Sequence, residues 1–159
     1  LFRSIEDKEL AFIRKPDQER PVVSGISGYD FLEINEECLQ NNYQNKDYIV
    51  TRIIEAWGTI EKYLNYGIGF IAVEGDRIAG MILGTANYEN ILPIDIETLK
   101  DHRKKGIATE LTRRFLAYCY DNKLTAYWNC IISNAESRNI AEKAGFQFIG
   151  SKDYYYFNI

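Results

Sequence analysis

Apolar residues return at helical spacing in three segments of the chain. From Ile49 to Leu64, isoleucine, leucine and tryptophan side chains recur every three or four residues, which predicts a helix over 46–65. The same spacing between Ile107 and Tyr118 produces one continuous apolar stripe, so 104–123 is the strongest predicted helix. A shorter helix over 133–145 ends at a glycine, the residue that most often closes a helix in the left-handed conformation.

Runs of β-forming residues separate these helices. A hairpin is predicted over 66–88, because two such runs flank the turn sequence at 74–76. Further strands are predicted over 90–99 and 124–132, and two more over 146–159, on either side of Gly150-Ser151. Residues 1–45 carry β-formers interrupted by glycines and predict no clear helix. The order α-β-β-β-α-β-α-β-β indicates a mixed sheet with helices packed on it.

Composition narrows the class of protein. The 159 residues suit one domain, and the net charge of 19 − 23 = −4 argues against a general binder of nucleic acid. No apolar run approaches the roughly 20 residues of a membrane span, and no secretory leader is seen. Three widely spaced cysteines favour a reducing cytoplasm, and a single histidine makes a metal site improbable. The chain begins with Leu1, which is compatible with a fragment or a processed chain.

A basic loop precedes the strongest helix. Residues 100–105 read Lys-Asp-His-Arg-Lys-Lys, with a net charge of +3 in an acidic chain. Cations are disfavoured at a helix N-terminus by a few tenths of a kcal/mol each, unless an anion binds there. The first amides of the helix lack partners within it, and Gly106 allows a ligand close to the backbone. The loop therefore predicts a phosphate cradle; the alternative is a solvated loop in which Gly106 only makes a turn.

Two motifs resemble the GNAT superfamily of N-acetyltransferases. Arg103–Ala108 matches its R/Q-x-x-G-x-G/A signature, after a strand and before the best helix. Asn134-x-x-Ser137, followed by NIAEKAGF, resembles the segment after the family's fifth strand. The chain is most similar to the branch typified by zwittermicin A resistance acetyltransferases, which has ET…R-x-K-G-x-A-T and W-x-C…S…A-E-K-x-G-F. This resemblance covers roughly residues 48–158.

The resemblance implies a fold and a domain division. The fold is α/β (α+β): a mixed, mostly antiparallel sheet has helices on both faces, and its fourth and fifth strands, here 90–99 and 124–132, splay apart. Residues 46–159 would form the acetyl-CoA-binding GNAT domain. Residues 1–45 would be an N-terminal strand and loop region, the end of a truncated N-terminal part if the chain is a fragment.

The resemblance also implies where coenzyme A would lie. Backbone amides at 104–109 would hold its pyrophosphate, and the backbone of Glu97–Leu99 would bond the pantetheine arm as an added strand does. Arg103 would orient the loop or neutralise charge, and Asn134 would bond the arm. The implied cofactor-binding residues are Thr98, Leu99, Arg103, Lys104, Lys105, Gly106, Ile107, Ala108, Thr109 and Asn134.

The implied reaction is direct acyl transfer to an amine, which must lose a proton to a base. Glu97 is the first candidate for base or amine anchor, with a solvated strand carboxylate as the alternative reading. Asp95 shares its strand face by alternation, so a carboxylate pair is predicted.

The residue at the usual position of the proton donor to the leaving thiolate differs from the family pattern. Ala141 stands where many members have a tyrosine, so Ser137 or a water is the substitute we consider first. The other candidates are Tyr127 and the run Tyr154, Tyr155 and Tyr156.

The function implied is an acetyl-CoA-dependent N-acetyltransferase acting on a primary amine of a small molecule, as a monomer or homodimer that binds neither nucleic acid nor membrane. Two alternatives stay open: a non-catalytic acyl-CoA-binding GNAT-like module, and an interaction domain whose basic loop meets an acidic protein.

Overall fold

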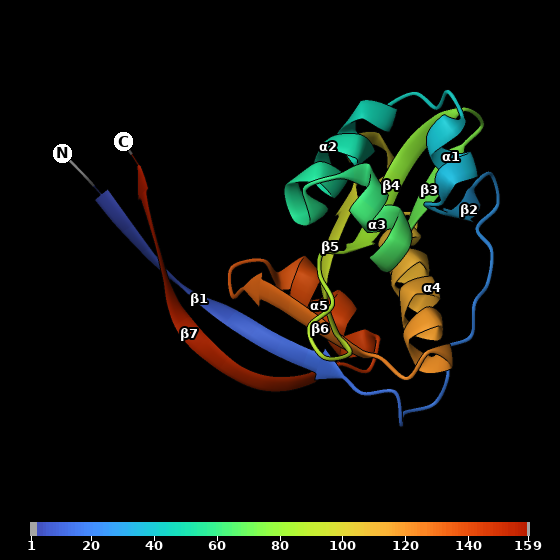
Figure 1. Ribbon diagram of the computed structural model, residues 1–159. Helices are drawn as coiled ribbons and strands as arrows, with labels where there is room; N and C mark the ends of the chain where they lie inside the picture. Colours follow the sequence, from blue (N-terminus) through green and yellow to red (C-terminus); the bar gives the residue numbers. More distant parts are fainter. Residues whose placement is uncertain (1–2, 159) are drawn as a thin grey trace.

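Seven strands form one mixed sheet in the computed structural model, which describes the backbone of residues 3–158 and the side chains of 7–153. The strand order is β2-β3-β4-β5-β6-β1-β7 (Figure 1). All neighbouring strands are antiparallel except β5 and β6. The strands are β1 (Arg3–Arg14), β2 (Asp30–Glu33), β3 (Gly69–Glu74), β4 (Arg77–Gly84), β5 (Ile91–Thr98), β6 (Thr125–Ile131) and β7 (Gln147–Asn158).

Helices cover both faces of the sheet, as predicted. They are α1 (Glu36–Gln40), α2 (Lys46–Trp57), α3 (Ile60–Tyr66), the short 3-10 helix η1 (Lys100–His102), α4 (Ile107–Asp121) and α5 (Ala135–Lys143). Within residues 3–158, none of these helices has the length and apolarity needed to cross a membrane.

The central strands are buried on both sides, which explains their nearly continuous apolar sequence. Ala72 and Ile82 pack into one core cluster with α4 and α5. Ile71 and Met81, one residue away on the same strands, pack into a second cluster with α1, α2 and α3. A single strand pair therefore joins the two cores.

The splay predicted between two neighbouring strands is confirmed at β5 and β6. Their parallel pairing is limited to Ile91–Pro93 against Thr125–Tyr127. Pro93 has no backbone N–H to donate. Beyond Pro93 the two strands separate, and a cleft opens between them.

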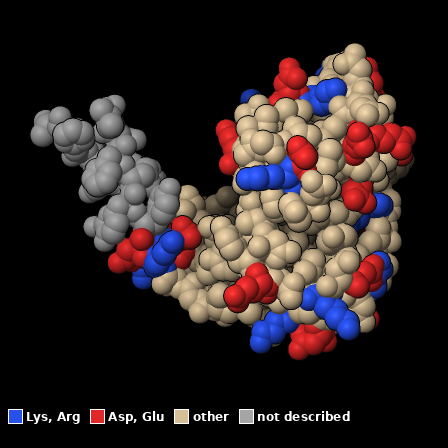
Figure 2. Space-filling view, viewed as in Figure 1, with Lys and Arg blue, Asp and Glu red and all other residues tan. Residues whose placement is uncertain are grey.

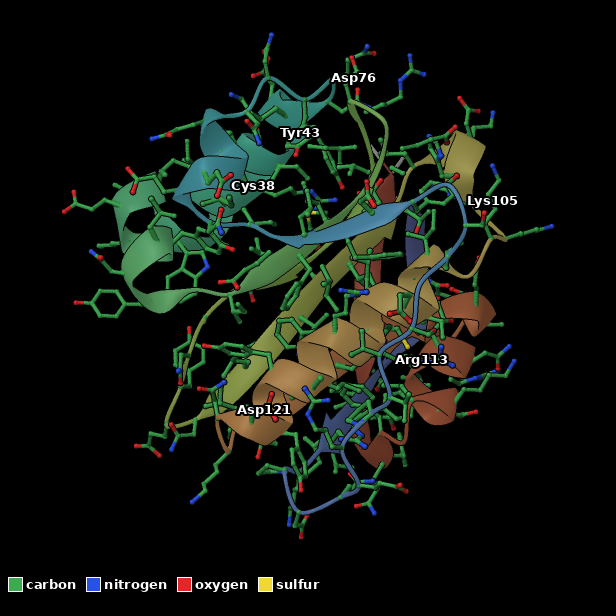
Figure 3. All side chains as sticks on the ribbon, turned by 90° about the vertical axis from the view of Figure 1, so that its right-hand side faces the viewer. Cys38, Tyr43, Asp76, Lys105, Arg113 and Asp121 are labelled. Atoms are coloured by element: carbon green, nitrogen blue, oxygen red, sulfur yellow. The ribbon has the colours of Figure 1, made fainter. Side chains whose placement is uncertain are left out.

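Helix α4 is held by a segment for which the sequence predicted no defined helix or strand. Residues 15–29 run along α4 from Asp121 at one end to Lys105 at the other (Figure 3). Arg20 pairs with Asp121 at 2.9 Å, and Ser24 donates its backbone N–H to the carboxylate of Glu110 at 2.9 Å. That carboxylate is 1% exposed, so the N-terminal segment is anchored in the core beside the basic loop.

Three details differ from the sequence expectations. The helix predicted over 46–65 is two helices, because Gly58 adopts a left-handed φ of 82° and Thr59 caps α3 by accepting from the N–H of Lys62. The two strands predicted over 146–159 are one strand, β7, with a bulge where Ile149 lies between Gly150, paired with Ala11, and Phe148, paired with Phe12. Within the N-terminal strand and loop region, neither the bounds of β1 nor its position between β6 and β7 was predicted.

Candidate active site

The gap between β5 and β6 opens into a cleft of about 340 Å³. A second hollow of about 180 Å³ continues it toward the start of α4 and shares Thr98, Ala108 and Ile140 with it. The two together form one groove from the splayed strands to the basic loop. The larger cleft is lined by Ile96, Glu97, Thr98, Arg103, Ala108, Trp128, Asn134, Glu136, Ser137 and Ile140.

The loop before α4 presents a run of unpaired backbone donors. Lys104 and Gly106 have positive φ angles of 61° and 84°, which turn the chain sharply into the helix, and no side chain caps α4. Among the described residues, the N–H groups of 104–109 have no hydrogen-bond acceptor. The carboxylate of Glu110 does not compete for them, because it accepts from Ser24 and Arg114. The described part of the protein therefore leaves these donors available to a ligand or to solvent.

Strand β5 turns one backbone edge toward the cleft, where the side chain of Arg103 donates to the carbonyl of Thr98 at 3.1 Å. The N–H of Leu99 donates to the carbonyl of Ala79 at 2.8 Å, on the β4 side. Because backbone groups alternate along a strand, Ile96 and Thr98 turn theirs toward the gap. Thr98 also has a buried hydroxyl that lacks a partner among the described residues. Ile96 was not predicted as a site residue, since only the register with β4 identifies it.

The structure brings most of the predicted cofactor residues to the groove. Seven of them, Thr98, Arg103, Lys104, Gly106, Ile107, Ala108 and Thr109, line the smaller hollow, and Asn134 lines the larger cleft. Leu99 and Lys105 do not line either one. The ammonium of Lys105 instead donates to the hydroxyl of Tyr29 at 3.3 Å, and Tyr29 also contacts His102 at 2.9 Å.

The start of α5 forms the opposite wall of the cleft. Asn134 caps the helix by accepting from the N–H of Ser137 at 3.1 Å. The hydroxyl of Ser137 accepts from the indole N–H of Trp128 at 3.0 Å. Ala141 is fully buried in the core cluster, so Ser137 is the hydroxyl that α5 offers to the cleft. Glu136, which we did not predict, places a carboxylate on the same wall.

Replacing Ser137 with alanine tests its structural contact. We expect Ser137→Ala to lower the free energy of unfolding by about 1–3 kcal/mol, because the nearly buried indole N–H of Trp128 loses its acceptor. Urea denaturation measures this change. Ser133→Ala is the matched control, because the exposed hydroxyl of Ser133 donates to Asp7. We expect this variant to lose less than about 0.5 kcal/mol of unfolding free energy. Equal losses in the two variants would contradict the role of the indole contact.

The second face of β5 carries the predicted carboxylate pair, and helix α2 supplies its partners. The guanidinium of Arg52 donates to Asp95 at 2.9 Å and also to Glu97. The hydroxyl of Tyr48 donates to the same Glu97 carboxylate. Burial raises the pKa of Asp95, and it also raises the pKa of Tyr48. Glu97 is therefore an engaged carboxylate rather than a solvated one.

Sequence reasoning missed Tyr48 and Arg52. Their only signal was an aromatic and a cation four residues apart on one predicted helix, which also describes an ordinary solvent-facing pair. Of the other tyrosines considered as proton donors, Tyr127 is half-buried on β6, and Tyr154–Tyr156 lie outside the residues whose side chains are described.

A splayed strand pair that ends at a cradle of free amides defines a protein suited to an extended ligand with a phosphate group. The chain belongs to the GNAT acetyltransferase family, whose model matches residues 10–155. It is 29% identical over 150 residues to the uncharacterized N-acetyltransferase YdfB of Bacillus subtilis. The aligned region covers 94% of this chain and 56% of that protein.

Solved structures show the same fold. A GCN5-related N-acetyltransferase-like protein from Streptococcus suis superposes with a TM-score of 0.72 at 17% identity, over 99% of this chain and 63% of that one. An acetyltransferase assigned to the GNAT family from Novosphingobium aromaticivorans superposes with a TM-score of 0.63 at 19% identity, over 96% of this chain and 65% of that one. The chain thus spans less than two thirds of the length of each of these relatives.

Proposed function

We propose that this chain is an acetyltransferase that moves the acetyl group of acetyl-CoA to a primary amine of a small molecule, by direct attack in a ternary complex. The observation that carries the proposal is the set of unpaired amides at 104–109, placed at the end of a cleft between splayed strands. Its motifs further support a place among the zwittermicin A resistance-type acetyltransferases.

The groove fits coenzyme A on features of this chain. Free N–H groups at a helix start, beside a loop of net charge +3, are the donors that a diphosphate requires. The backbone of Ile96 and the N–H of Thr98 offer partners to pantetheine amides, and the unpartnered Thr98 hydroxyl lies at the same edge. The Thr98 carbonyl is already held by Arg103. Asn134 has a side-chain N–H2 left to donate, because its oxygen caps α5.

The chemistry follows from the groups around the cleft. Bound acetyl-CoA supplies a thioester carbon that an amine can attack. The amine nitrogen forms a bond to that carbon, the carbon–sulfur bond breaks, and the amine proton passes to a base, for which we propose Glu97. The leaving thiolate takes a proton, for which we propose Ser137 or a water beside it. Residues 46–159 would hold the coenzyme, and residues 1–45 add two strands and the segment along α4.

The acceptor and setting are proposals of the same kind. An amine acceptor suits a cleft that Glu97 and Glu136 both line, since carboxylates favour a cation. All three cysteines lie within the described residues and none forms a disulfide, which supports a reducing cytoplasm. The protein would act as a monomer or homodimer without nucleic acid or membrane. The acetyl-CoA-binding module without turnover is the second candidate, favoured by Ala141 in the place of a tyrosine.

Acetyl-CoA is expected to stabilise the protein against heat. At about 100 times its Kd, a ligand that binds only the folded state contributes about 2.7 kcal/mol, or roughly 5–10 °C in Tm for a domain of this size. A thermal-shift series with acetyl-CoA measures this, with desulfo-coenzyme A as a thioester-free ligand and adenosine as a ligand without diphosphate. Release of thiol with a panel of small amines then separates the enzyme from the non-catalytic module. No shift with acetyl-CoA would overturn both.

A further inference from the structure

Helix α2 contributes two side chains to the carboxylate that faces the cleft, and this inference rests on the proposed function. We propose that Arg52 and Tyr48 are positioning residues: they fix the Glu97 carboxylate through one of its oxygens and leave the other as the proton acceptor for the incoming amine.

Both contacts from α2 reach the same oxygen. The guanidinium of Arg52 and the hydroxyl of Tyr48 both donate to Oε2 of Glu97. Among the described residues, Oε1 of Glu97 has no hydrogen-bond partner, and Glu97 lines the cleft where the thioester would lie. Because two donors hold Oε2, the carboxylate cannot rotate freely about its last bond. Oε1 is thereby left as the oxygen of this cleft-lining carboxylate that has no donor among the described residues.

Arg52 is itself held in place by two contacts besides the one to Glu97. Its second nitrogen donates to Asp95 at 2.9 Å, and its guanidinium lies 5.3 Å from the centre of the Tyr48 ring. Its side chain is 31% exposed, and those of Asp95 and Glu97 are 29% and 33% exposed. Partial burial makes such contacts more effective than those of a surface pair, and a planar guanidinium suits two carboxylates better than an ammonium does.

The charges around the pair determine how it responds to pH. From α2 the pair is faced by Arg52, Tyr48 and Glu55; from β4 its neighbours are the uncharged Met81 and Leu83. Burial raises the pKa of Asp95, and Arg52 opposes that effect, with Glu97 and Glu55 acting in the same direction as burial. Arg52 is thus the cation that opposes the effect of burial on Asp95. Its removal raises the pKa of Asp95 further, so this carboxylate takes up a proton at higher pH.

The test is a pH series of kcat and kcat/KM on purified variants, with acetyl-CoA and the best amine from the panel. For Arg52→Gln we expect kcat to fall at least about tenfold, and the acidic limb of the profile to move up by about one pH unit. Arg52→Lys should recover part of the loss in kcat and part of the shift of the acidic limb. It restores the positive charge, but it lacks the two guanidinium nitrogens that reach both carboxylates. Tyr48→Phe should lower kcat about three- to tenfold with a smaller move of the limb. KM for acetyl-CoA should stay within about twofold in all three.

Arg77→Gln is the matched control, because Arg77 is an exposed arginine at the start of β4 that contacts Gln44 and lines neither hollow of the groove. It should leave the profile unchanged. A loss of kcat in Arg52→Gln without movement of the acidic limb would overturn the positioning role, and so would an equal loss in the control. If Arg52→Gln does not fold, Arg52→Lys and Tyr48→Phe decide the question on the same two readouts. A wild-type protein that binds acetyl-CoA but acetylates no amine removes the proposed function, and the positioning role with it; an active wild type with an unchanged Arg52→Gln removes the positioning role alone.

Discussion

Replacing Gly106 with aspartate should weaken acetyl-CoA binding by about 100-fold or more. The new carboxylate would stand at the first turn of α4, among the unpaired amides that we propose hold the diphosphate. Two unit charges about 5 Å apart repel by about 3 kcal/mol at an effective dielectric constant of ~20, and each 1.4 kcal/mol is tenfold in Kd. Isothermal titration calorimetry with acetyl-CoA measures the change.

The hairpin turn offers a matched control for this substitution. Gly75 also has a positive φ, 61° against 84° for Gly106, and a Cβ at either position meets no atom closer than 3.6 Å. Gly75→Asp therefore imposes a similar backbone strain, of order 1 kcal/mol, at a residue that lines neither hollow of the groove. It should leave the Kd within about twofold. Equal weakening by the two variants would mean that strain, and not a carboxylate in the cradle, disturbs binding.

The unpaired amides before α4 were predictable because their signal is local. Cations placed where the helix dipole disfavours them, next to a glycine and the most regular apolar stripe of the chain, lie within about ten consecutive residues. The helix α4 follows from the same stretch, since Ile107, Leu111 and Phe115 return at helical spacing and are all buried. A feature that depends only on residues close together in the sequence can be predicted without knowing the rest of the fold.

Strand β1 was not predictable on the same basis. It pairs with β6 and β7, which follow it by more than a hundred residues, and its sequence has four charged residues (6–9) followed by four apolar ones (10–13), with neither strand alternation nor a turn signal to fix its partner. The segment after it has no helical or strand spacing, yet Ser24 reaches the buried carboxylate of Glu110. Such contacts are set by tertiary packing, which a local pattern does not encode.

The carboxylate pair combines a feature that the sequence predicts with one that it does not. Alternation along β5 correctly placed Asp95 and Glu97 on one face of the strand. It gave no indication of Arg52 and Tyr48, which come from a helix more than 40 residues earlier in the chain. The type of residue at the site follows from the strand, whereas its protonation and orientation depend on the helix packed above it.

The position of the cradle depends in turn on how α4 packs, which makes Phe115 the most sensitive core residue to test. Its ring is fully buried and reaches β4, where a Cβ on Gly84 would meet it at 3.4 Å. We expect Phe115→Ala to lower the free energy of unfolding by about 3–5 kcal/mol, because a cavity remains where the ring was. Chemical denaturation measures this loss, and Tm should fall by roughly 10 °C or more.

Phe148→Ala removes the same side chain from the edge strand β7, where the ring is 58% exposed and contacts Phe12 edge to face at 5.7 Å. It should cost only about 1 kcal/mol, since little apolar surface leaves the core. Below the melting transition, Phe115→Ala should still bind acetyl-CoA, because the free amides lie two turns away at the start of the helix. A loss of stability no larger than that of Phe148→Ala would contradict the packing of α4 against the sheet, and with it the physical basis for the position of the cradle.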